Sequence, residues 1–165
     1  MKLWSIVLGL LAVVCGGSAL AAPKRIHVFV ALADNASQGI APVPAKIGNG
    51  DDADANLYWG ASEGFRSVFG RSKAWKLEKA ETSPTAEILD RRSYRHADKD
   101  CILVAEAWRG KNIHECLEAF FACLRDRRGD LTAFIGHNGL MDAPVAVSVL
   151  NPGAPPTDAI ILCCV

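Results

Sequence analysis

Four short apolar runs, separated by helical or loop-like sequence, constrain the fold of this chain most strongly. In these runs apolar residues follow one another directly, as they do in strands that are buried on both faces. Strands of this kind that alternate with helices form βαβ units with parallel strands and right-handed crossovers. The sequence therefore predicts an α/β fold, a three-layer sandwich with a mostly parallel sheet. The four runs are Ile26–Ala33, Cys101–Trp108, Leu131–His137 and Asp158–Val165.

The sequence between the runs predicts three helices. Asn56–Phe69 has apolar residues at helical spacing, and Ser83-Pro84 is a favourable start for a weaker helix that covers Ala86–Arg95. Asn112 and Glu115 form a capping box in front of the most regular helix, which should end before residue 129.

Three further segments are expected to be extended or irregular. Trp75–Ala80 alternates apolar with charged residues, as a half-exposed edge strand does. A long loop rich in proline and glycine is expected at 37–54, and loops of that length are commonly functional or disordered. A short strand is expected at 146–150.

The first 21 residues have the pattern of a secretory signal peptide. Lys2 supplies a positive start, Leu3–Val14 is apolar, and Ala19-Leu20-Ala21 is a small-residue cleavage site. The apolar stretch is about a dozen residues, shorter than the ~20 that span a bilayer as a helix. An uncleaved anchor is the alternative. We expect a secreted or periplasmic protein, free of the membrane after cleavage, whose residues 22–165 form a single α/β domain.

The last residues also predict how the domain continues. Asp158–Val165 is an apolar strand without a polar tail, and such a strand leaves an unprotected edge. The sequence is therefore expected to be the front portion of a longer protein or a truncated product, incomplete at its C-terminus.

Charge and cysteine content narrow the function classes. The formal net charge is zero and no basic stripe is present, so nucleic acid is not an expected partner. The acidic run at 51–54 lacks the spacing of a calcium loop, and we expect neither a metal nor a cofactor. Outside the leader the cysteines are odd in number, which predicts an unpaired thiol or an intermolecular bond. They are Cys101, Cys116, Cys123, Cys163 and Cys164.

Two of the strand-like runs end in groups that can carry chemistry. His137 ends one run, and Cys163 and Cys164 end the next. In open α/β sheets, active sites collect at the carboxyl ends of the strands. A histidine beside a cysteine can accept the thiol proton and later donate a proton to a leaving amine. Neighbours in a strand point to opposite faces, so one of the two cysteines faces such a site.

Glycine close to the histidine adds a second element. The Asn138-Gly139 pair can form a turn with positive φ, and the backbone N–H groups of Gly139 and Cys164 could stabilise an oxyanion. The plain alternative is that His137 only ends a strand and that both cysteines belong to the core.

The segments Phe134-Ile-Gly-His137-Asn138-Gly139 and Ile160-Ile-Leu-Cys163-Cys164, after βαβ-like units, resemble the core of the caspase-like (clan CD) cysteine peptidases. In that family one strand ends in His-Gly and the next core strand ends in the catalytic Cys. The resemblance implies that Cys164 is the nucleophile and His137 the general base. It also implies that Asp34 contributes to a pocket for substrates with Arg or Lys. Asn138 departs from the family's immediate His-Gly pair.

The resulting hypothesis is an exported caspase-like cysteine hydrolase that acts on a peptide or protein, or its truncated, inactive form. The alternatives are a non-catalytic secreted binding or scaffold protein of the same fold, and an α/β domain unrelated to peptidases. If the strand of His137 and the strand of the cysteines are not neighbours in the sheet, the domain is unrelated to peptidases. If they are neighbours, the hydrolase and the binding or scaffold protein both remain.

Overall fold

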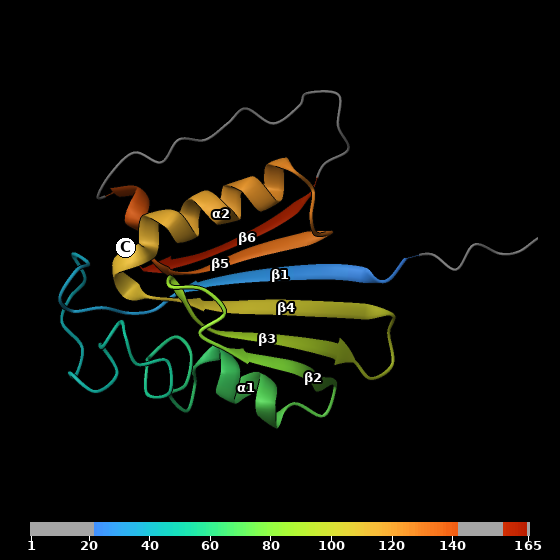
Figure 1. Cartoon of the computed structure of the whole chain (residues 1–165), viewed down its shortest axis with the longest axis horizontal. Coiled ribbons are helices and arrows are strands. Elements are labelled where there is room, and N and C mark those ends of the chain that lie inside the picture. The colour runs from blue at the N-terminus through green and yellow to red at the C-terminus, as the bar shows by residue number, and fades with distance from the viewer. Residues whose placement is uncertain (1–21, 142–156, 165) are drawn as a thin grey trace, which may run out of the picture.

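The fold is seen in a computed structural model that describes residues 22–141 and 157–164 (Figure 1). The predicted signal peptide at 1–21 and the predicted strand at 146–150 lie outside this range. One sheet of six strands runs through the described part of the molecule. Its elements are β1 (Lys24–Ala31), α1 (Phe65–Arg71), β2 (Trp75–Thr82), β3 (Ile88–His96), β4 (Cys101–Trp108), η1 (Gly110–Asn112), α2 (Ile113–Arg125), β5 (Leu131–His137), η2 (Gly139–Met141) and β6 (Asp158–Cys164).

The sheet is mixed, with the strand order β2-β3-β4-β1-β5-β6. β4, β1, β5 and β6 run parallel to one another, whereas β3 is antiparallel to both β2 and β4. The α/β class is therefore confirmed, and the predicted mostly parallel sheet is corrected to a mixed one. The four apolar runs form the parallel half of the sheet.

In the antiparallel half, β2 confirms the half-exposed edge strand predicted at 75–80, whereas β3 replaces a predicted helix. Residues 88–96 form β3, whose inward positions Ile88, Asp90 and Tyr94 are buried at a spacing of two and four residues. The pair Ser83-Pro84, interpreted as a helix start, lies instead in the turn of the β2–β3 hairpin, where Ser83 has a φ of 48°. Both interpretations suit Ser-Pro, because the pair is also common in turns.

The helix predicted at 56–69 is likewise shorter than expected. Only Phe65–Arg71 is helical, and residues 56–64 form a series of tight turns. Gly60 sits so close to the backbone of Ala53 and Asp54 that a Cβ there would overlap their carbonyl oxygens. The backbone packing that needs this glycine replaces the first turns of the predicted helix.

Two apolar cores cover the two faces of the sheet. α2 packs on one face, where Phe120 lies against Phe29 and Phe134. On the other face α1 and the turns before it pack over Trp59 and Tyr94. The α2 helix is confirmed, but the predicted capping box is not formed: Asn112 makes no side-chain cap hydrogen bond, and the 3₁₀ turn η1 leads into the helix instead.

On the α1 face of the sheet, a buried carboxylate links β3 to α1 and to the turns before it. The Asp90 carboxylate is only 6% exposed; it accepts hydrogen bonds from Trp59 Nε1 at 3.0 Å and from Arg92 Nε at 2.8 Å. Arg66 lies 3.7 Å from the same carboxylate. Asp90 thus satisfies the indole N–H of a fully buried tryptophan and balances two guanidinium groups.

Asp90→Ala should lower the free energy of unfolding by about 3 kcal/mol, because it leaves the buried indole N–H of Trp59 without its acceptor and removes the carboxylate that pairs with Arg92. Urea unfolding followed by tryptophan fluorescence measures this loss. Asp54→Ala is the matched control, since Asp54 pairs with Arg66 but its side chain is 86% exposed, and it should move the midpoint little. Equal losses in the two variants would contradict the role given to Asp90.

His27 on β1 predicts a pH dependence of stability. Burial lowers the pKa of His27 below its ordinary value of about 6.5. The unfolded chain therefore binds a proton at His27 more readily than the folded chain does. It follows that stability rises as the pH increases from the lowered pKa to about 6.5, and levels off above it. His27→Gln should flatten this rise between pH 5 and 7.5 in urea titrations; an unchanged slope would contradict the assignment.

Candidate functional site

The carboxyl ends of the four parallel strands meet at one edge of the sheet. In Figure 1 this is the left edge, where the loop after β1 and the short η2 turn also lie. Across the sheet the four parallel strands lie in the order β4-β1-β5-β6. β1 therefore has the next parallel strand of the chain, β4, on one side and the one after it, β5, on the other side. Such a switch point between β1 and β5 is where open α/β sheets form a crevice for ligands.

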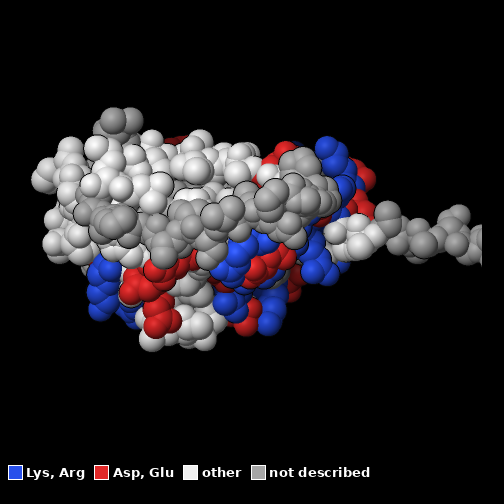
Figure 2. Space-filling view, turned by 90° about the horizontal axis from the view of Figure 1, so that it is seen from above, with Lys and Arg blue, Asp and Glu red and all other residues white. Residues whose placement is uncertain are grey.

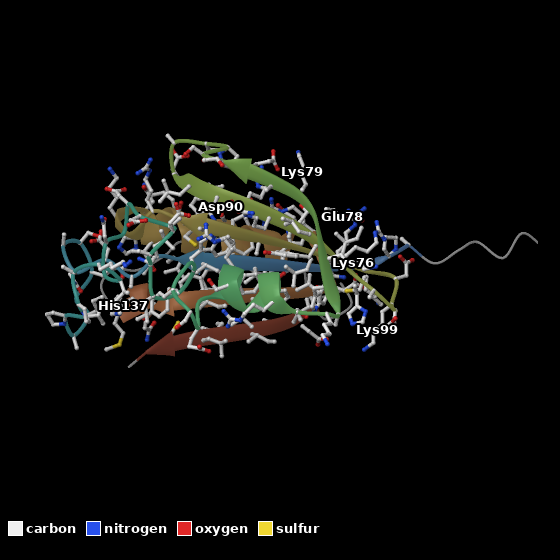
Figure 3. The ribbon with its side chains drawn as sticks, turned by 90° about the horizontal axis from the view of Figure 1, so that it is seen from below. Lys76, Glu78, Lys79, Asp90, Lys99 and His137 are labelled. Carbon is white, nitrogen blue, oxygen red and sulfur yellow. The ribbon has the colours of Figure 1, made fainter. Side chains whose placement is uncertain are left out.

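His137 and Cys164 occupy facing positions at this edge. β5 pairs with β6 in parallel, and the register sets His137 opposite Cys164 and Gly136 opposite Cys163. Adjacent strands lie about 5 Å apart, so the two backbone positions are as near as neighbouring strands allow. Figure 3 shows His137 at the end of the sheet opposite to Lys99. Cys164 is located here by the register of its backbone.

The two faces of β6 distinguish the two cysteines. Cys163 is half-buried and packs against the core beneath α2. Ile135 of β5 packs into the core on the opposite face. Because positions two apart in a strand share a face, His137 belongs to the face of Ile135, and position 164 belongs to the face that Cys163 does not use.

The remaining described thiols lie in surroundings that keep them protonated. Burial raises the pKa of Cys116 well above its ordinary value, and it raises the pKa of Cys123 and Cys101 as well. The thiolate is the nucleophilic form of cysteine, so these three side chains are poor nucleophiles at neutral pH. Among the described cysteines, the candidate nucleophiles therefore lie at the end of β6.

Gly139 opens the turn η2 and is buried against α2. A Cβ at this position would lie 3.0 Å from Ile113 Cδ1 and 3.1 Å from Leu117 Cδ1. Among the described residues no glycine has a positive φ, so the left-handed turn predicted for Asn138-Gly139 is wrong. Glycine at this position leaves room for the close approach of α2. Its N–H as an oxyanion donor stays a prediction.

Asp34 follows β1 at the same edge, and its carboxylate serves its own turn. It accepts hydrogen bonds from the Ala36 N–H at 3.0 Å and from Ser37 Oγ at 2.5 Å. This is the hydrogen bonding of an aspartate-initiated turn. A contribution of Asp34 to a substrate pocket stays a prediction.

Two buried amides hold the loop after β1, and the sequence analysis singled out neither of them for this role. Asn56 is fully buried and exchanges two hydrogen bonds with the backbone of Ala33. Gln38 donates from Nε2 to the carbonyls of Leu32 and Gly110, each at 2.9 Å, and so links the end of β1 to the end of β4. Their sequence context carries no signal, because an amide in a loop is ordinarily exposed.

The acidic run at 51–54 is engaged in local pairing. Asp51 lies 2.6 Å from Arg109, Asp54 pairs with Arg66, and Asp52 accepts hydrogen bonds from the backbone of its own turn. Within 22–141 and 157–164, no three His, Cys, Asp or Glu side chains are grouped so that they could hold a metal ion. In the same ranges, none of the helices combines the length and apolar character needed to cross a membrane.

Asp34→Ala should lower stability by about 1 kcal/mol, because the backbone of the turn loses its acceptor. Thermal unfolding measures that loss. If Asp34 also contacts a basic substrate side chain, as the resemblance implied, the variant would lose a preference for Arg or Lys substrates over Leu substrates in a cleavage assay. An unchanged preference would leave Asp34 a turn residue alone.

No protein-family model, curated protein or solved structure matches the chain. Any function must therefore be inferred from the groups at the carboxyl edge of the sheet and from their geometry.

Proposed function

We propose that this protein is a cysteine hydrolase of the caspase-like, three-layer type, with Cys164 as nucleophile and His137 as general base. The observation that carries the proposal is the register of β5 and β6, in which these two positions face each other. The substrate class is a peptide or protein. The pattern of residues 1–21 supports export of the protein.

The chemistry follows from the two groups. The His137 imidazole takes the proton of the Cys164 thiol, and the thiolate attacks the carbonyl carbon of the substrate. Backbone N–H groups at the strand ends, those of Gly139 and Cys164, stabilise the oxyanion. The tetrahedral species collapses as His137 protonates the leaving amine. Water, deprotonated by His137, then hydrolyses the thioester and restores the thiol.

The position of the β2–β3 hairpin also supports the proposal. The sequence between β1 and β4 does not intervene between the histidine strand and the cysteine strand, because β2 and β3 extend the sheet on its far side. Among the strands of the described residues, the histidine strand and the cysteine strand follow each other in the chain and are adjacent in the sheet, in agreement with the resemblance to caspase-like peptidases.

Alkylation of the full chain by iodoacetamide at pH 6–8 tests the dyad, with peptide mapping to identify the modified thiol. Cys164 should react faster than an ordinary thiol below pH 8, because an imidazolium partner stabilises its thiolate. His137→Ala should slow the reaction at least about tenfold. The matched control is His96→Ala, which should leave the rate unchanged. His96 ends β3 beside the start of β4, at the opposite end of the sheet from the carboxyl end of β5.

Cys163→Ala should retain the fast reaction, whereas Cys164→Ala should abolish it. Fast alkylation that is insensitive to His137→Ala would favour the second candidate, a non-catalytic secreted binding or scaffold protein. Reaction of Cys163 in place of Cys164 would contradict the assignment of the nucleophile.

A further inference from the structure

An apolar groove lies on the α1 face of the sheet, below the ends of β5 and β6. Its volume is about 430 Å³, within the range of ~300–1,000 Å³ that small-molecule pockets occupy. Helix α1 and the turns before it form one wall, and β5 and β6 form the other. The lining residues are Leu57, Tyr58, Glu63, Phe65, Val68, Phe69, Ile135 and Leu162.

The α1 wall is held rigidly by stacked aromatic rings. Phe65 and Phe69 stack with their centroids 4.2 Å apart, and Phe65 also stacks on the fully buried Trp59 at 5.6 Å. Phe69 in turn contacts Tyr94 of β3 at 5.6 Å. Aromatic contacts of this kind fix ring positions, so the wall is formed before any ligand arrives.

The sheet wall connects the groove to the proposed dyad. Ile135 and Leu162 face each other across β5 and β6, and the next pair on the same face is His137 opposite Cys164. Two residues along a strand span about 7 Å, which is close to the length of a phenylalanine side chain measured from its own carbonyl carbon. A carbonyl held at Cys164 could therefore place its side chain in the groove.

The groove walls are open to a ligand and almost without charge. Leu162 is 57% exposed and Val68 is 42% exposed, an unusual exposure for large apolar side chains that line a concave surface. Glu63 is the residue of the lining that carries a charge at neutral pH, and it is itself exposed. Seen from above the view of Figure 1, the surface is also largely uncharged at the upper left, whereas charged residues gather along the lower side and at the right (Figure 2).

We propose that this groove binds a large apolar side chain of the substrate, of leucine or phenylalanine size, on the residue whose carbonyl Cys164 attacks. The proposal rests on the proposed function and names its substrate class. It assigns specificity to Phe65, Val68, Phe69 and Leu162 in place of Asp34. A charged side chain is disfavoured, because its desolvation against these apolar walls is costly and Glu63, the charged residue of the lining, is exposed to solvent, where an ion pair contributes little.

Matched peptide acyloxymethyl ketones test the proposal on the full chain. The Cys164 thiolate attacks the methylene carbon of such a probe, a C–S bond forms, and the carboxylate leaves. Probes that differ only in the side chain next to the ketone, Phe, Leu, Arg or Asp, are compared by the rate of labelling measured by mass spectrometry. The Phe and Leu probes should label at least about tenfold faster than the Arg and Asp probes.

Variants show whether the groove is the origin of this preference. Val68→Lys places a positive charge at an exposed position of α1, where it attracts an acidic side chain, so the ratio of the Phe-probe rate to the Asp-probe rate should fall at least about fivefold. Leu77→Lys is the matched control: Leu77 is 50% exposed on β2 and does not line the groove, so the ratio should stay as in the parent chain. Thermal unfolding confirms that both variants are folded.

The outcomes distinguish the two levels of the proposal. His137-dependent alkylation of Cys164 by iodoacetamide, together with a preference for the Arg or Asp probe, would overturn the apolar pocket and keep the dyad. Alkylation that does not depend on His137 would overturn both. A Phe preference that survives Val68→Lys unchanged would also overturn the assignment to this groove.

Discussion

The candidate site depends on the parallel pairing of β1 with both β4 and β5. β1 runs through the middle of the sheet, and its residues enter the cores on both faces, Val28 and Val30 on one side and Phe29 and Ala31 on the other. A strand that is apolar on both faces has no side that favours solvent, so it is most stable in the centre of the sheet. With β1 in the centre, the ends of β4, β5 and β6 are aligned at one edge.

Buried polar side chains add hydrogen bonds to this apolar packing. At the carboxyl edge Asn56 and Gln38 bind backbone groups that strand ends leave unpaired, and on the α1 face Asp90 accepts from Trp59 and Arg92. Unpaired groups of this kind would be costly in a buried position. The loop after β1 is therefore an ordered part of the site edge, built from turns that follow one another closely.

The same packing separates the thiols into two classes. Cys116 and Cys123 lie on the buried side of α2, where a low dielectric disfavours the thiolate. The end of β6 is different, because the sheet brings a histidine position beside it and an apolar groove lies below it on one face. A general base and a place for a side chain are the two features that a cysteine hydrolase needs around its nucleophile.

The sequence by itself determined the parallel strands and the principal helix. β4, β5 and α2 follow directly from local runs, since continuous apolar residues mark a strand covered on both faces and apolar residues at helical spacing mark a helix packed on one. It also predicted that the strand of His137 and the strand of Cys164 run side by side.

Tertiary structure alone decided the rest. The segment 88–96 became β3 because β2 and β4 offered it partners and its buried Asp90 found Trp59, which lies far away in the chain. The predicted helix starts later than expected because another stretch of backbone occupies the space beside Gly60, and the groove exists because α1 and β6, distant in sequence, line the same face of the sheet. These contacts join residues that are distant in the sequence, so no pattern within a short segment could predict them.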